Sequence, residues 1–204
     1  MKRCFIIPFV LIICLLSACI SGDDGSDSET TTPPPNMEAI DGVVTQEEYD
    51  HKAEFSNGNF VVYWRFQDES IIFAMVAKTD GMIALGFEPE TGMKDADMVI
   101  GWVKDGVAYL FDCYSIGETG PHPEDINLQG NDDITAYAGV EYGGFTTIEF
   151  SRKLITEDTF DKDIPKTGIL NVIWAYGPED SLTLGHTNNG GGMLKMDSSD
   201  VVGY

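Results

Sequence analysis

The chain has 204 residues, of which 43% are hydrophobic and 23% charged, which is enough for one domain with a buried core. Its formal net charge is −22, with 12 lysines and arginines against 34 aspartates and glutamates. Because phosphate contacts need clusters of Lys and Arg, this balance argues against nucleic-acid binding and against electrostatic docking on an anionic membrane. Such a surface suits a basic partner or divalent cations, although a solvated acidic face is the simpler interpretation.

Residues 1–18 have the pattern of a signal peptide. A basic pair at 2–3 precedes an apolar run at 4–16, which is shorter than the roughly 20 residues needed to span a bilayer. The motif Leu-Ser-Ala-Cys at 16–19 resembles the lipobox of prokaryotic lipoproteins, with Cys19 as the lipidated first residue of the mature protein. An ordinary secretory signal is the alternative. We therefore expect an exported protein, held by a lipid anchor on the extracytoplasmic side of the cell membrane.

Residues 19–38 are predicted to be a tether. Between Ser21 and Asn36 the chain is acidic and polar, and it includes three consecutive prolines at 33–35. This composition favours a disordered linker that is stiffened near the prolines. The folded domain is expected at 39–204, with Cys113 as its one cysteine, a buried thiol without a disulfide partner.

Within this domain, short segments rich in β-branched and aromatic residues predict many strands. Strands are expected at 59–66, 71–77, 82–87, 98–103, 107–114, 134–140, 145–151, 169–176 and 193–196. An Asp-Gly pair at 105–106 indicates a tight hairpin, a capped helical turn is expected at 45–49, and a long polar loop at 117–133. Since no long segment has a 3.6-residue period, the pattern predicts an all-β antiparallel sandwich.

Few residues are candidates for chemistry. The three histidines, His51, His122 and His186, are far apart in the chain, so no local multi-histidine zinc or copper motif exists. The sequence lacks a Cys-x-x-Cys-His motif for covalent haem, a P-loop, a dinucleotide-binding glycine motif and a Gly-x-Ser-x-Gly motif.

Acidic residues in the long polar loop are a further candidate. Asp125, Asp132 and Asp133 could bind calcium together with loop carbonyls, but the EF-hand spacing is absent. A solvated loop is the simpler interpretation of these three side chains.

Met93 lies on a Gly-Met corner directly before a predicted strand in which Met98 and Ile100 face one way and Val99 the other. A thioether at such a bend either fills a gap in the core or offers a soft ligand to a metal. His186 lies where an apolar strand gives way to a glycine-rich loop. Taken alone, such a histidine is usually a surface residue, and most methionines fill cores.

The order of motifs resembles the DOMON domain family. Gly86-Phe87 is followed by Gly-Met-Lys-Asp-Ala-Asp-Met-Val-Ile-Gly-Trp at 92–102, and the likeness extends over about 40–194. It implies an immunoglobulin-like β-sandwich that binds a haem b or a sugar. In the cytochrome members one methionine and one histidine hold the iron axially, and Met93 and His186 match these positions, with His122 as a rival ligand.

This resemblance implies a non-covalent haem b enclosed between apolar strand faces. Met/His ligation leaves no open position on the iron, so the implied activity is one-electron transfer with an extracytoplasmic redox partner protein rather than catalysis. There is one departure. Many relatives follow the histidine with a cationic pair, and residues 188–190 are Asn-Asn-Gly here, which leaves a haem propionate without a charged partner.

The alternative is a haem-free module that binds carbohydrate or another small ligand on the same sandwich. Trp64, Trp102 and Trp174 could stack on sugar rings, although aromatic residues on strands more often belong to the core. A copper monooxygenase is poorly supported because histidines are so few.

Overall fold

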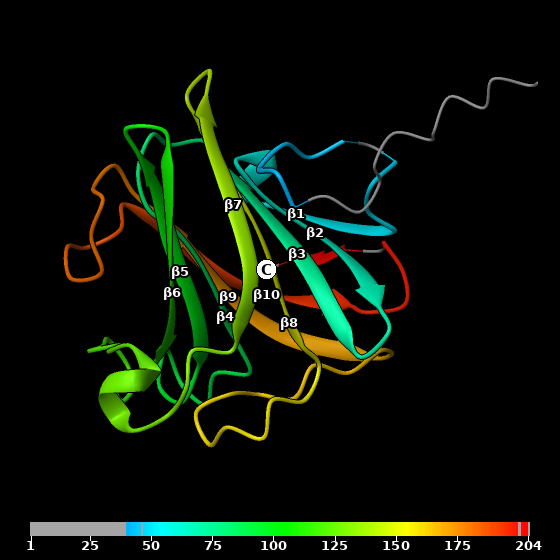
Figure 1. Cartoon of the computed structure of the whole chain (residues 1–204), viewed down its shortest axis with the longest axis vertical. Helices are drawn as coiled ribbons and strands as arrows, with labels where there is room; N and C mark the ends of the chain where they lie inside the picture. Colours follow the sequence, from blue (N-terminus) through cyan, green and yellow to red (C-terminus); the bar gives the residue numbers. More distant parts are fainter. Residues whose placement is uncertain (1–39, 46, 200, 204) are drawn as a thin grey trace, which may run out of the picture. The chain divides into compact units, whose positions relative to one another are not determined.

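The structure is a computed structural model, which describes residues 40–45, 47–199 and 201–203. These residues form two antiparallel β-sheets packed face to face, together with two single turns of 3-10 helix (Figure 1). The prediction of an all-β antiparallel sandwich is therefore confirmed. The predicted signal peptide at 1–18, Cys19 and the tether at 19–38 lie outside the described residues. No helix within the described ranges is both long and apolar enough to cross a membrane.

Five strands form one sheet and six form the other. The first sheet, in the order β1-β2-β3-β8-β7, contains β1 (His51–Phe55), β2 (Phe60–Gln67), β3 (Ser70–Ala77), β7 (Ile134–Tyr142) and β8 (Phe145–Lys153). The second, in the order β11-β10-β9-β4-β5-β6, contains β4 (Ile83–Phe87), β5 (Asp97–Lys104), β6 (Val107–Tyr114), β9 (Ile169–Tyr176), β10 (Asn188–Lys195) and β11 (Val201–Gly203). The 3-10 turns are η1 (Ser56–Gly58) and η2 (Asp125–Leu128).

The sequence prediction misses β1, β11 and the first half of β10. Three glycines at 190–192 suggest a loop, because glycine weakens a strand. The structure pairs them with β9, and a Cβ on Gly190 would lie only 2.5 Å from the Trp174 ring. Glycine is thus required here by the close approach of a neighbouring side chain.

The turn predicted at 45–49 is present, although it is not a helix. One capping bond is present, in which the Thr45 N–H donates to Glu48 Oε2 at 3.1 Å, and the turn is closed by the Glu48 N–H, which donates to the Thr45 carbonyl oxygen at 3.3 Å. The described residues around them form a turn that does not continue into a helix.

The six-stranded sheet is apolar on both faces. Leu85 and Val99 point into the main core between the sheets, where both are fully buried. Met98 and Ile100 point the opposite way, into a second apolar cluster on the outer face. The predicted alternation along β5 is therefore confirmed. Cys113 belongs to the second cluster as a buried free thiol, as expected, and burial raises its pKa.

We expect the variant Leu85→Ala to lose about 2–5 kcal/mol of unfolding free energy, because it leaves a cavity in the middle of the main core. Val107→Ala, at a site that is 54% exposed on the same sheet, is the control and should stay within about 0.5 kcal/mol of the parent. Urea unfolding followed by circular dichroism measures both. Equal losses in the two variants would contradict this assignment of the core.

Candidate functional site

A cavity of about 600 Å³ lies on the outer face of the six-stranded sheet. This volume is within the range of about 300–1,000 Å³ that is usual for sites that bind small molecules and cofactors. Alternate residues of β4, β5 and β9 form the floor: Ala84, Gly86, Met98, Ile100, Ile173 and Ala175. The expectation of a slot between apolar strand faces needs correction, because one sheet face forms the floor and loops form the walls.

The middle of the floor is open because its side chains are small. Ala84 is paired with Ala175, and Gly86 with Ile173, across the β4–β9 ladder. A Cβ on Gly86 would lie 2.7 Å from Ile173 Cγ1, so a larger residue would displace that neighbour. The result is a shallow apolar surface suited to a flat, apolar ligand.

Met93 belongs to the wall that rises beside β5. Its side chain is half-buried against the second apolar cluster, and its N–H donates to the Glu118 carbonyl oxygen at 3.0 Å. The preceding Gly92 has a φ of 62°, and a Cβ there would lie 2.6 Å from the same carbonyl oxygen. This contact requires glycine, and it holds the loop with Met93 against the loop that contains Glu118.

His122 lies on the same wall. Its Cδ2 and the Cε of Met93 are each 3.8 Å from the position that a Cβ on Gly120 would occupy, so the two side chains flank one point. Burial lowers the pKa of His122, and the nearby charge of His186 lowers it further. His122 therefore favours its neutral form, which is the form that can bind a metal.

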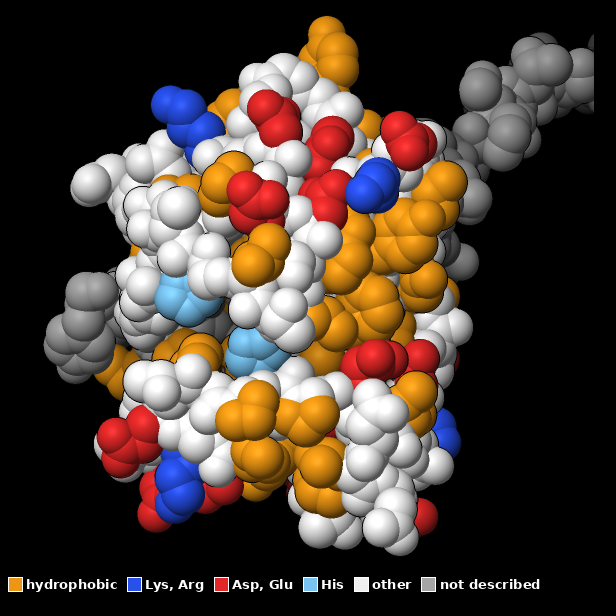
Figure 2. Space-filling view, turned by 90° about the vertical axis from the view of Figure 1, so that its left-hand side faces the viewer, with side chains coloured by type: hydrophobic (Ala, Val, Ile, Leu, Met, Phe, Trp, Pro, Cys, Tyr) orange, Lys and Arg blue, Asp and Glu red, His pale blue; other side chains and the backbone are white. Residues whose placement is uncertain are grey.

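His186 approaches the cavity from the other flank. It lies in the connection from β9 to β10, at the opposite side of the floor from β5 in the strand order β10-β9-β4-β5. A Cβ on Gly177 would lie 3.0 Å from the His186 Cα, so glycine allows this loop to come close. The Nδ1 of His186 is 3.2 Å from the side-chain amide of Asn189. Figure 2 shows two histidine side chains near each other on a hollowed part of the surface.

The cavity thus brings Met93 and His186 together, and it brings His122 to them as well. Among the residues that the structure describes, neither Lys nor Arg lines it, and Glu118 is the one carboxylate in its walls. The sequence alone did not predict that Asn189 and the small floor residues line the site. The alternation of alanine and glycine in strands buried on both faces is the signal that could have identified the floor.

The three tryptophans have separate surroundings. Trp64 is fully buried in the main core, and its Nε1–H donates to the Met196 carbonyl oxygen at 3.2 Å. Trp102 packs on the outer face of the six-stranded sheet against Phe111, with 5.1 Å between ring centroids. Trp174 borders the cavity, but its ring belongs to the main core, where it stacks on Phe60 with 5.4 Å between ring centroids. His51 lies away from the cavity, against Trp64.

Comparison with known proteins shows which sequences this chain is related to. A family model for the DOMON domain matches residues 56–177. DBH-like monooxygenase protein 1 of Mus musculus is 31% identical over 133 residues, 65% of this chain and 21% of the relative. The Homo sapiens protein of the same name is 32% identical over 139 residues, 67% of this chain and 22% of the relative. The chain therefore spans about a fifth of the length of these relatives.

Among solved structures, the cytochrome b domain of pyranose dehydrogenase from Coprinopsis cinerea is similar, with a TM-score of 0.54 over 71% of this chain and 80% of that chain. Its sequence identity is 14%, so this likeness concerns the fold alone. The match of the family model covers more than half of the chain. The chain belongs to the DOMON domain family.

Proposed function

We propose that the cavity on the outer face binds a b-type haem without a covalent bond, and that Met93 and His186 would hold its iron. One observation carries this proposal: a thioether and an imidazole, far apart in the chain, line the same apolar cavity from opposite flanks of its floor. The shared fold with a domain described as a cytochrome b domain supports it. With Met/His ligation, such a group exchanges single electrons.

The residues present fit this group. The floor at Ala84, Gly86 and Ala175 offers an apolar surface, and loops form the walls around it. A thioether and a neutral imidazole are suitable iron ligands. Since neither Lys nor Arg lines the described cavity, the haem propionates would have no charged partner in its walls. The acidic surface of the chain favours a basic redox partner protein outside the cytoplasm.

Asn189 is a positioning residue for His186 in this proposal. If Nε2 of His186 binds the iron, Nδ1 carries the proton and needs an acceptor. The Asn189 amide, 3.2 Å away, supplies one when its oxygen faces the ring, since the amide oxygen and nitrogen exchange places by a flip of the side chain.

We expect wild-type protein loaded with haem to show a low-spin spectrum that Met93→Leu and His186→Ala each abolish, because each removes one axial ligand. The absorption of the oxidised and dithionite-reduced protein measures the change. Met82→Leu, which alters another methionine of the cavity, is the matched control and should keep the spectrum.

His122→Ala decides between the two histidines on the same samples. We expect this variant to retain the low-spin spectrum. If it loses the spectrum while His186→Ala keeps it, His122 is the ligand and the proposed pair is wrong.

We expect Asn189→Ala to weaken haem affinity by about 10–100-fold, the usual effect of losing the partner of a ligating histidine. Asn189→Asp should restore the affinity, because a carboxylate also accepts the Nδ1–H bond, and it should lower the reduction potential by making the ligand more basic. Haem titration and redox potentiometry test both, with Asn188→Ala as the exposed neighbouring control. Equal affinities of Asn189→Ala and Asn188→Ala would contradict the positioning role.

The second candidate is a haem-free module for carbohydrate or another small ligand, favoured by the lack of a described cation for a propionate in the cavity lining. Titration distinguishes the two functions. A protein that stays colourless when haem is supplied, and whose tryptophan fluorescence changes on addition of glycans, would support this module and contradict the cytochrome proposal.

We also propose that the domain of residues 39–204 is held at the extracytoplasmic face of the membrane through lipidated Cys19 and the tether at 19–38. The Leu-Ser-Ala-Cys motif supports this placement. We expect Cys19→Ser to abolish metabolic labelling with palmitate and to release the protein from the membrane fraction. Retention of the label in the variant would contradict lipidation at this residue.

A further inference from the structure

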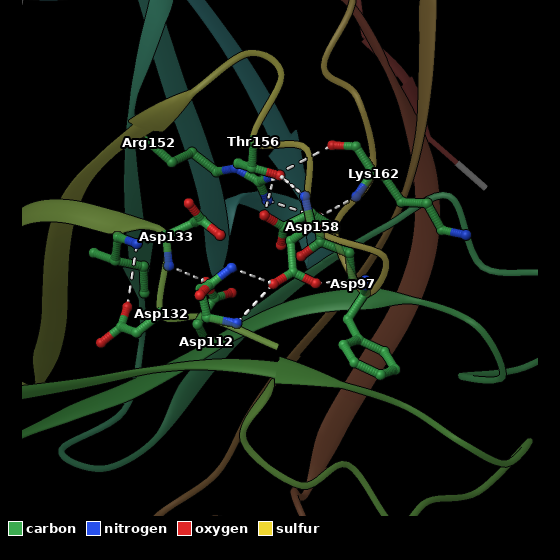
Figure 3. Close-up of polar contacts among 12 residues, drawn as sticks. Asp97, Asp112, Asp132, Asp133, Arg152, Thr156, Asp158 and Lys162 are labelled. Atoms are coloured by element: carbon green, nitrogen blue, oxygen red, sulfur yellow. Dashed lines mark hydrogen bonds and ion pairs between the residues drawn. The ribbon is translucent and has the colours of Figure 1, made fainter. Parts of the chain in front are cut away.

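A group of buried carboxylates lies on the other side of the six-stranded sheet from the cavity. Asp97 on β5 and Asp112 on β6 occupy positions that face the interior of the sandwich, as Val99 does. Asp161 joins them from the loop between β8 and β9. One carboxylate oxygen of each lies within 4.8 Å of those of the other two. Figure 3 shows Asp97 and Asp112 in this group, with Arg152 beside them.

The positive charge in this group is too small to balance the negative charge. Arg152 reaches in from β8, with Nη1 2.6 Å from Asp97 Oδ2 and Nη2 3.3 Å from Asp161 Oδ2. Three ionised carboxylates and one guanidinium leave two negative charges in a buried place. Uncompensated charge of this kind strongly opposes folding unless a proton or a cation neutralises it.

Several oxygens in the group also lack hydrogen-bond donors. Backbone N–H groups of Lys162 and Asp133 donate to one oxygen of Asp97 and one of Asp112, each at 2.8 Å. The second oxygen of each and Oδ1 of Asp161 are buried without a hydrogen-bond partner in the described part of the chain, and Oδ2 of Asp161 has the ion pair with Arg152 alone. Buried polar atoms are nearly always paired, so these oxygens point to a missing ligand.

The buried side chain of Asp125 is a second, separate indication that a ligand is missing. It lies on η2, outside the group of three, and its residue is only 1% exposed. Neither of its carboxylate oxygens has a hydrogen-bond partner within the described ranges. Glu124 forms an isolated bridge with Cys113, the residue after Asp112, so Asp125 lies beside the end of β6 that carries Asp112.

We propose that Asp97, Asp112 and Asp161 bind a calcium ion between the two sheets, with Asp125 as a further acidic ligand. The donor set consists of hard oxygens without His or Cys, which favours calcium or magnesium over zinc or copper. Calcium holds oxygens at 2.3–2.6 Å, so two ligands of one ion can be up to about 5 Å apart, in agreement with the spacing here. Smaller Mg²⁺ prefers to keep several of its waters.

Of the three aspartates that the sequence suggested as calcium ligands, one belongs to the proposed site and two do not bind the ion through their side chains. Asp125 belongs to the site, and Asp133 contributes its backbone N–H to Asp112. Asp132 is exposed, and its Oδ1 accepts a bond from the Ile134 N–H at 3.1 Å, so it takes no part (Figure 3). Asp158 already accepts bonds from two backbone N–H groups and is satisfied without an ion.

The ion would link two parts of the chain to the sheet. Asp161 ties down the loop after β8, and Asp125 ties down the segment after β6. That segment also carries Glu118 and His122 in the wall of the outer cavity. Calcium would therefore stabilise the fold and hold one wall of the cavity in place.

The full chain, treated with a chelator and then dialysed, tests this site without haem. We expect calcium chloride to raise the melting temperature by about 5–10 °C at a hundredfold excess over Kd, and calorimetric titration to give one site per chain. Magnesium should act more weakly. The absence of any shift and of any heat up to about 10 mM calcium, above the range of weak extracellular calcium modules, would overturn the proposal.

Asp112→Asn separates an ion ligand from a residue that merely supports the fold. The asparagine oxygen can still accept a hydrogen bond from the Asp133 N–H, whereas the substitution removes one buried negative charge. We expect calcium affinity to fall by more than about 10-fold, and the calcium-free variant to melt at least as high as calcium-free wild type. The exposed Asp163→Asn, on the loop that carries Asp161, is the control and should bind calcium normally.

Two results with this variant would contradict the site. One is calcium affinity equal to that of wild type. The other is a calcium-free variant that melts lower than calcium-free wild type and binds calcium as tightly as the Asp163→Asn control. If Asp112→Asn does not fold, Asp125→Asn takes its place with the same expected loss of affinity.

Discussion

The six-stranded sheet must cover apolar side chains on both of its faces, and most features of this domain follow from that requirement. One face is covered by the five-stranded sheet, as in any sandwich. The other face carries Met98 and Ile100, and no third sheet covers it in the described structure. Loops before β5, after β6 and after β9 cover it instead. Where the floor residues are small, these loops do not fill the space, and the cavity results.

Such loops are held by specific contacts. Gly92 approaches the Glu118 carbonyl, and Gly177 approaches His186, each at a distance that leaves no room for a Cβ. The cavity walls are thus positioned by close backbone packing rather than by disulfides, which agrees with the single buried cysteine of the described chain. A ligand held between such walls would be bound by side chains that the fold places before the ligand arrives, which reduces the entropy lost on binding.

The strong negative charge of the chain has two different consequences. On the surface it is solvated and affects mainly the choice of partner. In the interior, three carboxylates with one arginine are costly, and the fold retains them at a point where three segments meet. The segment after β6 carries both the buried Asp125 and His122 of the cavity wall. The two faces of one sheet are therefore connected by a single stretch of chain.

By itself the sequence determined the fold class, the alternation of Met98 and Val99 on β5, the buried state of Cys113 and the family, because these depend on local periodicity and on motifs that are continuous in the chain. It singled out Met93 and His186 only through resemblance. The tertiary structure decided which face of the sheet is hollow, that His122 shares the cavity, and that Asn189 contacts His186. It also made a strand of the Gly-rich segment and gathered Asp97, Asp112 and Asp161. These outcomes depend on register and on loop packing between residues distant in sequence, and no local pattern encodes them.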